Sequence, residues 1–493
     1  MKSEIFIGID MGSTGLKAVA FDSLTGRGLA TAGEALPFVR LPGGGCELEA
    51  EAIEAALMQA LQSVASQLGP RCAQVRALSC TGHGAGLYAL DNRRRLLRGR
   101  AVASTDQRAA ARARALALRR GQELFEEVGC QPWAGQPTLI AAEVLGPGTF
   151  QRGEISALLF AKDYLGLLLT GEAATDHSDA STAGLLDLET GAWSRLAIDA
   201  AGLPVQAWET LQPIVPGGTV LGGLLPDRAT QCGLAPGLPV AVSAIDLLAS
   251  LTAVGAPQRG QAVAVLGTWC VNAVVDAQRE PKPEVGAVVN FGAPGRRLYL
   301  ENSPSSMANI AWLVRTLKFD SAAQAVDCAM TAPLGALGAR FLPFINGGGA
   351  PEGATAGFIG LQSHHDRSHM ARAVVDAVAA LHARHLARLA SFGLGAQGPV
   401  AALGGGARDA RLVGLIASFL GQPVERCGDD ETGARGAALY AAKSQGASMP
   451  APPIEVVEHD ARNAAAYADY YDGFHELVET LSPAFAHLAQ TRQ

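Results

Sequence analysis

Several common signatures are absent from this sequence of 493 residues. Its eight cysteines form no CxxC pair and no other close metal-ligand spacing, so we expect reduced, mostly buried thiols. No GxxxxGK[ST] motif occurs, which excludes the P-loop as the means of binding phosphate. The N-terminal residues MKSEIFIGID lack the long apolar core and the small-residue cleavage site of a signal peptide, so we expect no secretory leader.

An excess of positive charge is also lacking. The chain has 39 basic and 46 acidic residues and a net charge of −7, which argues against nucleic acid as a partner. The most membrane-like run, residues 238–256, has Asp246 at its middle and predicts a buried strand entering a helix rather than a membrane span. The composition is typical of a soluble cytoplasmic enzyme, and the length predicts two or three domains.

The apolar pattern predicts strands that alternate with helices. Strands are expected at 5–10, 16–21, 75–80, 86–90, 239–243 and 399–407, and helices at 50–68, 107–128, 247–254, 305–317, 369–392 and 431–445. The segment 261–276 repeats the opening design of an apolar strand, a Gly/Thr turn and a second apolar strand. Residues 446–460 are expected to form a surface loop before a last helix. We therefore predict an α/β fold of two duplicated domains, residues 1–240 and 241–493.

The opening stretch IFIGIDMGSTGLKAVAFD places a carboxylate, Asp10, at the end of a buried strand. The turn after it contains small residues that can present backbone N–H groups and two hydroxyls to phosphate oxygens: Gly12, Ser13, Thr14 and Gly15. Asp10 can hold Mg²⁺ there, directly or through water. An ordinary hairpin is the alternative for a single copy. The second Gly-Thr turn, at Gly267 and Thr268, favours two hairpins that grip a nucleotide polyphosphate.

Two further motifs lie between a predicted strand and a predicted helix. In VAALGGGARDARL, residues 400–412, three glycines would let a flat ring or a phosphate approach the backbone, or simply form a tight turn. Asp246 stands between an apolar strand and an apolar helix, where it can serve as a general base or as a helix N-cap. These two roles of Asp246 are compatible.

Taken in order, these motifs resemble those of the FGGY carbohydrate kinases, within the sugar kinase, heat-shock ATPase and actin fold group. The resemblance runs collinearly over residues 5–445 and includes GIDMGSTGLKAVAFD, ALSCTGHGAGLYALD, STDQRA, KDYLGLLLTGEAATDHSDAS, GLAPGLPVAVSAID, VLGTWCVN and LGGGARDARLVGLIASFLGQPVE. It implies two actin-like (ribonuclease H-like) domains with a catalytic cleft between them. The first would hold the sugar and the first phosphate hairpin, and the second would hold the catalytic base, the second hairpin and the adenosine-binding turn.

The resemblance also implies a role for individual residues. Asp10 would organise Mg-ATP, and Asp246 would be the catalytic base. The remaining nucleotide-binding residues would be Gly12, Ser13, Thr14, Lys17, Gly267, Thr268, Gly405, Gly406, Ala407 and Ala410. The sugar would contact Gly82 and His83, with Asp106 and Trp133 at the border of its pocket.

The implied activity is transfer of the γ-phosphate of ATP to a hydroxyl of a xylulose-type ketopentose or a related polyol. The TGHG sequence resembles kinases for L-xylulose-type ketoses and erythritol more than typical D-xylulose kinases, and Leu247 replaces a customary hydrogen-bonding contact to the sugar. The altered sugar motifs leave two other readings: a non-catalytic ATP- or sugar-binding regulator and a plain ATPase of the same fold group. The resemblance further implies a homodimer.

Overall fold

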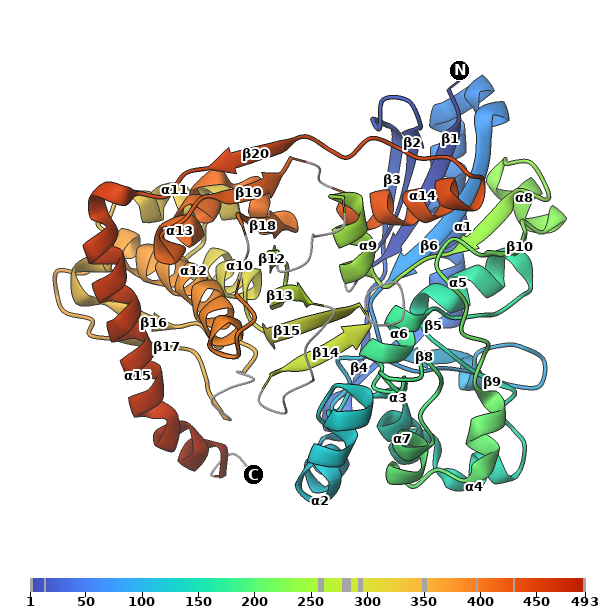
Figure 1. The fold of residues 1–493 in the computed structure, drawn as a ribbon, viewed down its shortest axis with the longest axis horizontal. Helices are drawn as coiled ribbons and strands as arrows, with labels where there is room; N and C mark the ends of the chain where they lie inside the picture. Colours follow the sequence, from blue (N-terminus) through green and yellow to red (C-terminus); the bar gives the residue numbers. More distant parts are fainter. Residues whose placement is uncertain are drawn as a thin grey trace. The chain divides into compact units, whose positions relative to one another are not determined.

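The protein is described here by a computed structural model. Its described residues are 3–12, 15–255, 261–276, 285–290, 296–347, 353–395, 398–428 and 431–490. The chain divides into two compact units (Figure 1), of which unit 1 comprises Met1–Ala256, Ala277–Leu298 and Glu431–Pro452, and unit 2 comprises Pro257–Asp276, Tyr299–Asp430 and Pro453–Gln493. We expected a single boundary after residue 240, whereas unit 1 extends to Ala256 and also includes the later segments Ala277–Leu298 and Glu431–Pro452.

The main sheet of unit 1 is mixed and has the strand order β10-β11-β6-β1-β2-β3. Its strands are β1 (Ile5–Met11), β2 (Gly15–Asp22), β3 (Gly28–Ala35), β6 (Val75–Gly82), β10 (Val220–Gly223) and β11 (Pro239–Val242). The neighbouring strands β1, β6 and β11 are parallel. Their carboxyl ends therefore meet at one edge, which is where open α/β sheets usually bind ligands.

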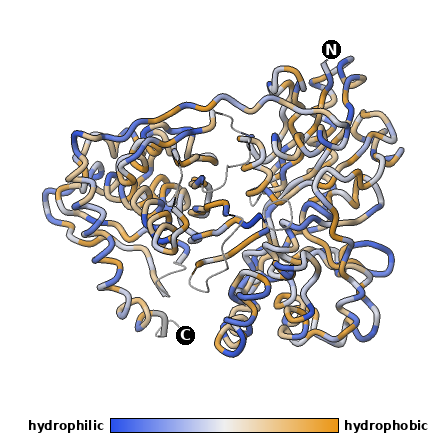
Figure 2. The backbone as a smooth tube through the Cα atoms, in the orientation of Figure 1, coloured by the Kyte–Doolittle hydropathy of each residue, from blue (hydrophilic) through white to orange (hydrophobic). Residues whose placement is uncertain are grey.

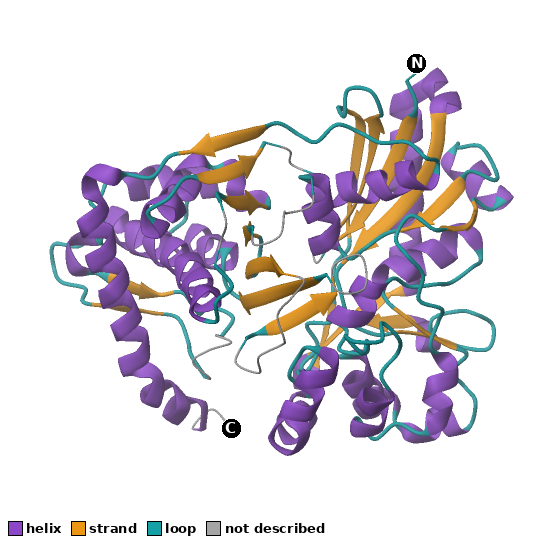
Figure 3. Cartoon of the chain, viewed as in Figure 1, coloured by secondary structure: helices purple, strands orange, loops and turns teal. Residues whose placement is uncertain are grey.

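Successive residues of β1 point to opposite faces of this sheet, and both faces are covered by helices (Figure 3). Ile5, Ile7 and Ile9 belong to the hydrophobic core shared with helix α1 (Ala50–Leu68). Phe6 belongs to a second core on the opposite face, which it shares with alanines of helix α14 (Thr432–Ser444). The apolar run of β1 is continuous because both of its faces are buried.

The remaining elements of unit 1 surround this sheet. They are the strands β4 (Val39–Leu41), β5 (Gly45–Glu49), β7 (Tyr88–Leu90), β8 (Arg100–Val102), β9 (Ala157–Leu159) and β14 (Ala287–Asn290), and the helices α2 (Ala110–Val128), α3 (Pro137–Ile140), α4 (Pro147–Gln151), α5 (Ala161–Thr170), α6 (His177–Thr182), α7 (Arg195–Ala200), α8 (Pro226–Cys232) and α9 (Asp246–Ala253). Helix α2 is the most hydrophilic of the longer helices in Figure 2. All eight cysteines are free thiols, as predicted.

Unit 2 contains a second mixed sheet, in which β15, β13, β12, β18, β19 and β20 lie in this order. The strands are β12 (Ala262–Leu266), β13 (Cys270–Asp276), β15 (Arg297–Ser303), β18 (Val400–Leu403), β19 (Val424–Cys427) and β20 (Ile454–Val457), with a separate pair β16 (Arg340–Leu342) and β17 (Gly357–Ile359). The helices are α10 (Met307–Thr316), α11 (Ala322–Met330), α12 (Arg367–Ser391), α13 (Ala410–Leu420) and α15 (Ala464–Gln490). Over the described residues, none of these helices or those of unit 1 is long and apolar enough to cross a membrane.

Strand β20 lies within residues 446–460, which we expected to be a loop. It pairs with β19 at the edge of the sheet, and its side chains at Ile454 and Val456 are about half exposed, at 48% and 52%. Main-chain hydrogen bonds hold such an edge strand, so no buried face marks it in the sequence.

Helix α14 packs unusually close to β1 and α9, and Figure 1 shows this late helix lying along the first strands. A Cβ atom built on Gly8 of β1 would lie 1.7 Å from the carbonyl oxygen of Ala434. One built on Gly436 of α14 would lie 1.9 Å from the carbonyl oxygen of Ala249 in α9, and one on Gly433 would lie 2.1 Å from Oδ2 of Asp10. Glycine at these positions therefore allows the backbones to touch and seats the first turn of α14 against Asp10.

This packing predicts opposite effects for the same substitution in two helices. Gly436→Ala should lower the free energy of unfolding by about 3 kcal/mol, because its methyl group would overlap main-chain atoms of α9. Gly473→Ala is the matched control: Gly473 lies in α15, and a methyl group added there would have no atom within 4 Å, so this substitution should raise stability by about 0.5–1 kcal/mol. Urea unfolding measures both changes, and equal effects would contradict the close packing of α14.

Candidate active site

Three of the residues singled out in the sequence lie at the adjoining carboxyl ends of β1, β6 and β11. Asp10 is the last residue but one of β1 and lies opposite Thr81 of β6, and the backbone N–H of His83 donates to the carbonyl oxygen of Met11 at 3.0 Å. The hydroxyl of Thr81 donates to the carbonyl oxygen of Ala244 at 2.7 Å, which ties the segment before Asp246 to the same edge. The parallel register thus brings Asp10, His83 and Asp246 together within unit 1.

The two aspartates share a poorly solvated, repulsive environment. Burial raises the pKa of Asp10 to about 6, with a further increase from Glu431 and a decrease from Lys17. Burial also raises the pKa of Asp246 to about 7, where the charge of Asp10 adds to the increase and a hydrogen bond from the backbone N–H of Leu247 opposes it. The buried Oδ1 of Asp10 has no hydrogen-bond partner among the described residues. Both carboxylates therefore lack sufficient positive charge nearby.

Lys17 and Glu431 form an ion pair beside Asp10. Lys17 lies opposite Asp10 in the β1–β2 hairpin, and its Nζ is 2.8 Å from Oε1 and 3.1 Å from Oε2 of Glu431. Glu431 directly precedes α14, so it reaches this site only because α14 returns to unit 1. In the sequence Glu431 is only the first residue of the motif ETGARGAALYAA, and its pairing with Lys17 was not predicted because 414 residues separate the two.

The turn of the first hairpin is formed as predicted where it is described. The backbone N–H of Gly12 donates to the carbonyl oxygen of Gly15 at 3.0 Å, and the strands on either side are antiparallel. Ser13 and Thr14 lie outside the described residues, so their expected contacts to phosphate stay predictions.

His83 is a neutral hydrogen-bonding group at physiological pH. Its side chain is partly buried, and burial lowers its pKa to about 4. Nε2 lies 3.2 Å from the hydroxyl of Tyr88, a fully buried side chain of β7 that sequence reasoning did not single out. The neighbouring glycines leave little excess space, because a Cβ on Gly82 would contact Ala161 at 3.3 Å. The predicted role of Gly82 and His83 in sugar binding remains a prediction.

The loops of Asp106 and Trp133 converge on the loop that follows His83. The backbone N–H of Gly86 donates to the carbonyl oxygen of Gly135 at 3.3 Å, and Gly135 packs against the ring of Trp133. The carboxylate of Asp106 is fully buried and accepts hydrogen bonds from the backbone N–H of Cys46 and from the Arg108 guanidinium at 2.7 Å each. Asp106 therefore ties its own loop to the backbone of Cys46 and to Arg108, while its expected contact with sugar stays a prediction.

A buried charge cluster surrounds Lys162 of α5. Nζ of Lys162 is 2.6 Å from Asp163, 3.1 Å from Asp176 and 3.6 Å from Asp179. Burial raises the pKa of Asp163 and, still further, that of Asp179. The cause is burial, because three ionised carboxylates around one ammonium would leave net negative charge in the protein interior. The sequence showed these residues only as part of the KDYL and TDHSDAS motifs.

The remaining predicted nucleotide-binding residues lie together in unit 2. Strands β12 and β18 are parallel with Val265 opposite Leu403, so the turn at Gly267 and Thr268 and the turn at Gly405–Ala407 leave the same edge of the sheet. A Cβ on Gly406 would lie 2.8 Å from that of Leu266. The carbonyl oxygens of Gly267 and Thr268 accept hydrogen bonds from the first N–H groups of the α10 segment, at 3.0 Å each. Ala410 is the first residue of α13.

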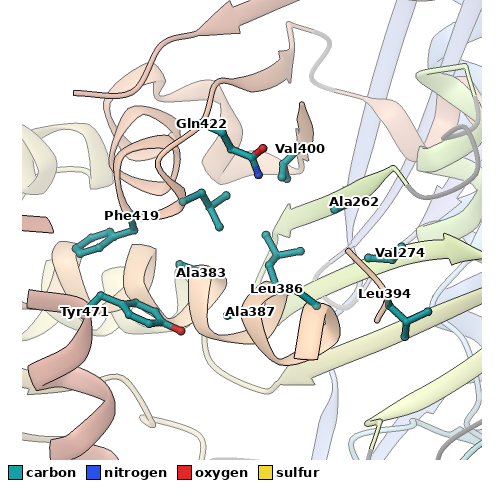
Figure 4. A pocket seen from close by; sticks show the side chains of 12 residues that line it. Ala262, Val274, Ala383, Leu386, Ala387, Leu394, Val400, Phe419, Gln422 and Tyr471 are labelled. Atoms are coloured by element: carbon teal, nitrogen blue, oxygen red, sulfur yellow. The ribbon is translucent and has the colours of Figure 1, made fainter. Parts of the chain in front are cut away.

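A cavity of about 270 Å³ in unit 2 lies away from these turns (Figure 4). Its lining includes Ala262 and Val274, which pair at the end of the β12–β13 hairpin opposite the turn, together with apolar side chains of α12 such as Leu386. It holds no charged side chain in its lining. This cavity is therefore unsuited to a polyphosphate.

Two units, each built from a mixed sheet covered by helices, define the actin-like ATPase fold of sugar kinases, as predicted. Residues 5–255 match the model of the FGGY family of carbohydrate kinases, N-terminal domain, and residues 262–444 match that of the C-terminal domain. The chain belongs to the FGGY family of carbohydrate kinases, a family that uses ATP.

The similarity extends over the full length of several relatives. A probable L-xylulose kinase of Pasteurella multocida (strain Pm70) is 26% identical and the match covers 97% of this chain and 99% of the relative. A xylulose kinase of Escherichia coli (strain K12) is 29% identical, with 98% and 100% covered. The crystal structure of xylulose kinase from Rhodospirillum rubrum matches with a TM-score of 0.84 at 26% identity, over 98% of this chain and 100% of that one.

The two raised pKa values predict how stability depends on pH. A carboxyl group that holds its proton more tightly in the folded protein stabilises the fold fully below its ordinary pKa of 3.8, and this contribution is lost as pH rises through about 6 for Asp10 and about 7 for Asp246. Asp246→Asn should therefore reduce the loss of unfolding free energy between pH 4 and pH 8, on the order of 2 kcal/mol.

Urea unfolding of the ligand-free protein at several pH values measures this loss. Asp227→Asn, which removes an exposed carboxylate of α8, is the control and should follow the wild-type pH dependence. An Asp246→Asn variant with the wild-type dependence would show that Asp246 ionises normally.

Proposed function

We propose that the protein is an ATP-dependent kinase that phosphorylates a hydroxyl of a xylulose-type ketopentose or a related polyol. The observation that carries this proposal is the environment of Asp246, whose pKa is raised to about 7 at the strand edge it shares with His83 and Asp10. A general base works best when its pKa lies near the working pH. The similarity to a probable L-xylulose kinase and to a xylulose kinase supports the substrate class.

Asp246 would act as the proton acceptor in the transfer. The acceptor hydroxyl gives its proton to the Asp246 carboxylate as its oxygen forms a bond to the γ-phosphorus. The bond from that phosphorus to the β–γ bridging oxygen breaks, which yields ADP and a sugar phosphate. The hydrogen bond from the backbone N–H of Leu247 holds one carboxylate oxygen at 2.6 Å and fixes the direction in which the carboxylate points.

Asp10 is suited to a magnesium ion that accompanies the nucleotide. Its buried Oδ1 has no partner among the described residues, and carboxylate oxygen is a ligand that Mg²⁺ prefers. No cluster of three or more metal-binding side chains occurs in the described parts of the chain, so the other ligands would be phosphate oxygens and water. When bound, Mg²⁺ would supply the positive charge that the phosphates need. Asp10, with Lys17 held beside it by Glu431, would bind and orient this group.

The other nucleotide contacts are proposed for unit 2. The turns at Gly267–Thr268 and Gly405–Ala407 leave neighbouring strands at one edge, which suits a phosphate chain and an adenosine that are bound as one molecule. Glycine at 405, where an added Cβ would have no atom of the described residues within 4 Å, would let the ligand approach the main chain.

His83 is the proposed polar contact to the sugar. Its low pKa keeps it neutral, so it can donate or accept one hydrogen bond without placing a charge beside the acceptor hydroxyl. The next residue after Asp246 is Leu247, whose side chain would offer the sugar only an apolar surface. We therefore expect a preference set by few polar contacts and by the shape of the pocket.

A panel of ketoses, polyols and sugar acids tests the function through sugar-dependent ADP formation. The wild-type protein should be stimulated most by a xylulose-type ketose or a related polyol. Asp246→Asn should lower kcat about 10²- to 10⁴-fold, because it keeps the size of the side chain and removes the proton acceptor. Its affinity for ADP, measured by calorimetry, should stay close to that of the wild type.

The matched control is again Asp227→Asn, which should keep wild-type turnover. Binding of ligand without stimulation by any sugar would indicate a non-catalytic regulator, and full ATP hydrolysis without sugar would indicate a plain ATPase. Sugar-dependent turnover that survives in Asp246→Asn would place the proton acceptor elsewhere.

A further inference from the structure

The segment that carries Asp246 is held by a serine of a different helix. The backbone N–H of Ile245, the residue before Asp246, donates to Oγ of Ser178 in α6 at 3.1 Å. Ser178 is 0% exposed and Ile245 is 2% exposed, so water cannot replace this bond. A buried N–H group that loses its partner is costly, and the segment around it shifts to regain one.

Ser178 itself is fixed by the buried charge cluster. The carboxylate of Asp176 caps α6 and accepts hydrogen bonds from the backbone N–H groups of Ser178 at 2.9 Å and Asp179 at 3.3 Å. Nζ of Lys162 lies 3.1 Å from that cap and 3.2 Å from the hydroxyl of Thr175. Because all these groups are buried, the cluster holds the Ser178 backbone, from which the hydroxyl reaches Ile245.

The same short helix contacts the loop that follows His83. Oδ1 of Asp179 accepts a hydrogen bond of 3.4 Å from the backbone N–H of Ala85, a residue held at a φ of +59°. A Cβ on Gly84 would lie 2.9 Å from Cγ2 of Thr182 and 3.6 Å from the side chain of Ile245. Helix α6 thus touches both segments that the proposed reaction requires to be in register.

A second hydrogen bond fixes the Asp246 segment from the other side. The carbonyl oxygen of Ala244 accepts from the hydroxyl of Thr81, while the N–H of the next residue donates to Ser178. The peptide group between Ala244 and Ile245 is therefore hydrogen-bonded at its oxygen to Thr81 of β6 and at its nitrogen to Ser178 of α6. Rotation of this peptide would turn the Asp246 carboxylate away from its place beside Asp10.

We propose that Ser178 is a positioning residue for the Asp246 carboxylate, with the buried Lys162–Asp163–Asp176–Asp179 cluster as its support. This role rests on the proposed function of Asp246 as the proton acceptor. In this role Ser178 acts on the proposed base through the peptide group that precedes it.

Ser181 provides a matched control on the same helix. Its hydroxyl is 1% exposed and also accepts from a buried backbone N–H, that of Asn290 in β14, at 3.0 Å. Ser178→Ala and Ser181→Ala therefore remove the same group from the same kind of bond. They should lower the melting temperature by similar amounts, and only Ser178→Ala loosens the Asp246 segment.

Steady-state kinetics with the best sugar of the panel separates the two variants. Ser178→Ala should lower kcat about 10-fold with little change in the KM for ATP, whereas Ser181→Ala should stay within about 2-fold of the wild type. The acidic limb of the pH profile of kcat/KM should also move to lower pH in Ser178→Ala alone. A loosened segment lets water reach Asp246, and better solvation lowers the pKa of a carboxyl group. Equal kcat values and equal acidic limbs in the two variants would overturn the proposal.

Two readouts do not depend on activity. Hydrogen exchange of the peptide covering residues 243–248 should become faster in Ser178→Ala and stay unchanged in Ser181→Ala, and the ¹³C NMR titration of Asp246 should shift to lower pH in the first variant only. A wild-type protein that no sugar stimulates would contradict the proposed function, and these readouts would still decide the inference. Unchanged exchange and an unchanged titration in Ser178→Ala would show that Ser178 does not position Asp246.

Discussion

The repulsion between two carboxylates at the end of a parallel sheet is the constraint on which this structure depends. The register of β1, β6 and β11 places Asp10 and Asp246 at one edge of the sheet. Helix α14 packs over Asp10 at Gly433, so closely that a Cβ atom there would overlap Oδ2 of Asp10. Neither group is neutralised by a direct ion pair among the described residues, since Lys17 is bonded to Glu431. The fold thereby leaves carboxylate oxygens without a counter-charge from the described side chains where the proposed Mg²⁺ of the nucleotide would bind.

The protein handles buried charge in two different ways. Around Lys162, three aspartates are packed about one buried ammonium group, whose charge attracts all three carboxylates. At Asp10 and Asp246 the charge is left uncompensated, which destabilises the ligand-free protein and raises the pKa of the proposed base. The uncompensated pair thus stands next to a buried cluster held around one ammonium group, and α6 is the element that joins the two.

Much of this arrangement was predictable from local sequence patterns. The strands β1, β2 and β6 and the helices α1, α9 and α14 appear where apolar periodicity predicted them, and the order of motifs predicted the family. Local patterns did not indicate the return of residues 431–452 to unit 1 or the edge strand β20, because both depend on pairing with distant segments. For the same reason the contacts of Glu431, Tyr88 and Ser178 were not predicted, although these residues lie in or beside family motifs.

The most direct test of the account is the ionisation of Asp246 itself. A ¹³C NMR titration of its carboxyl carbon in the ligand-free wild-type protein should give a midpoint near 7, and the midpoint should fall when Asp10 is replaced by asparagine, because the neighbouring charge is then removed. A midpoint close to the ordinary value of 3.8, unaffected by Asp10→Asn, would contradict the account.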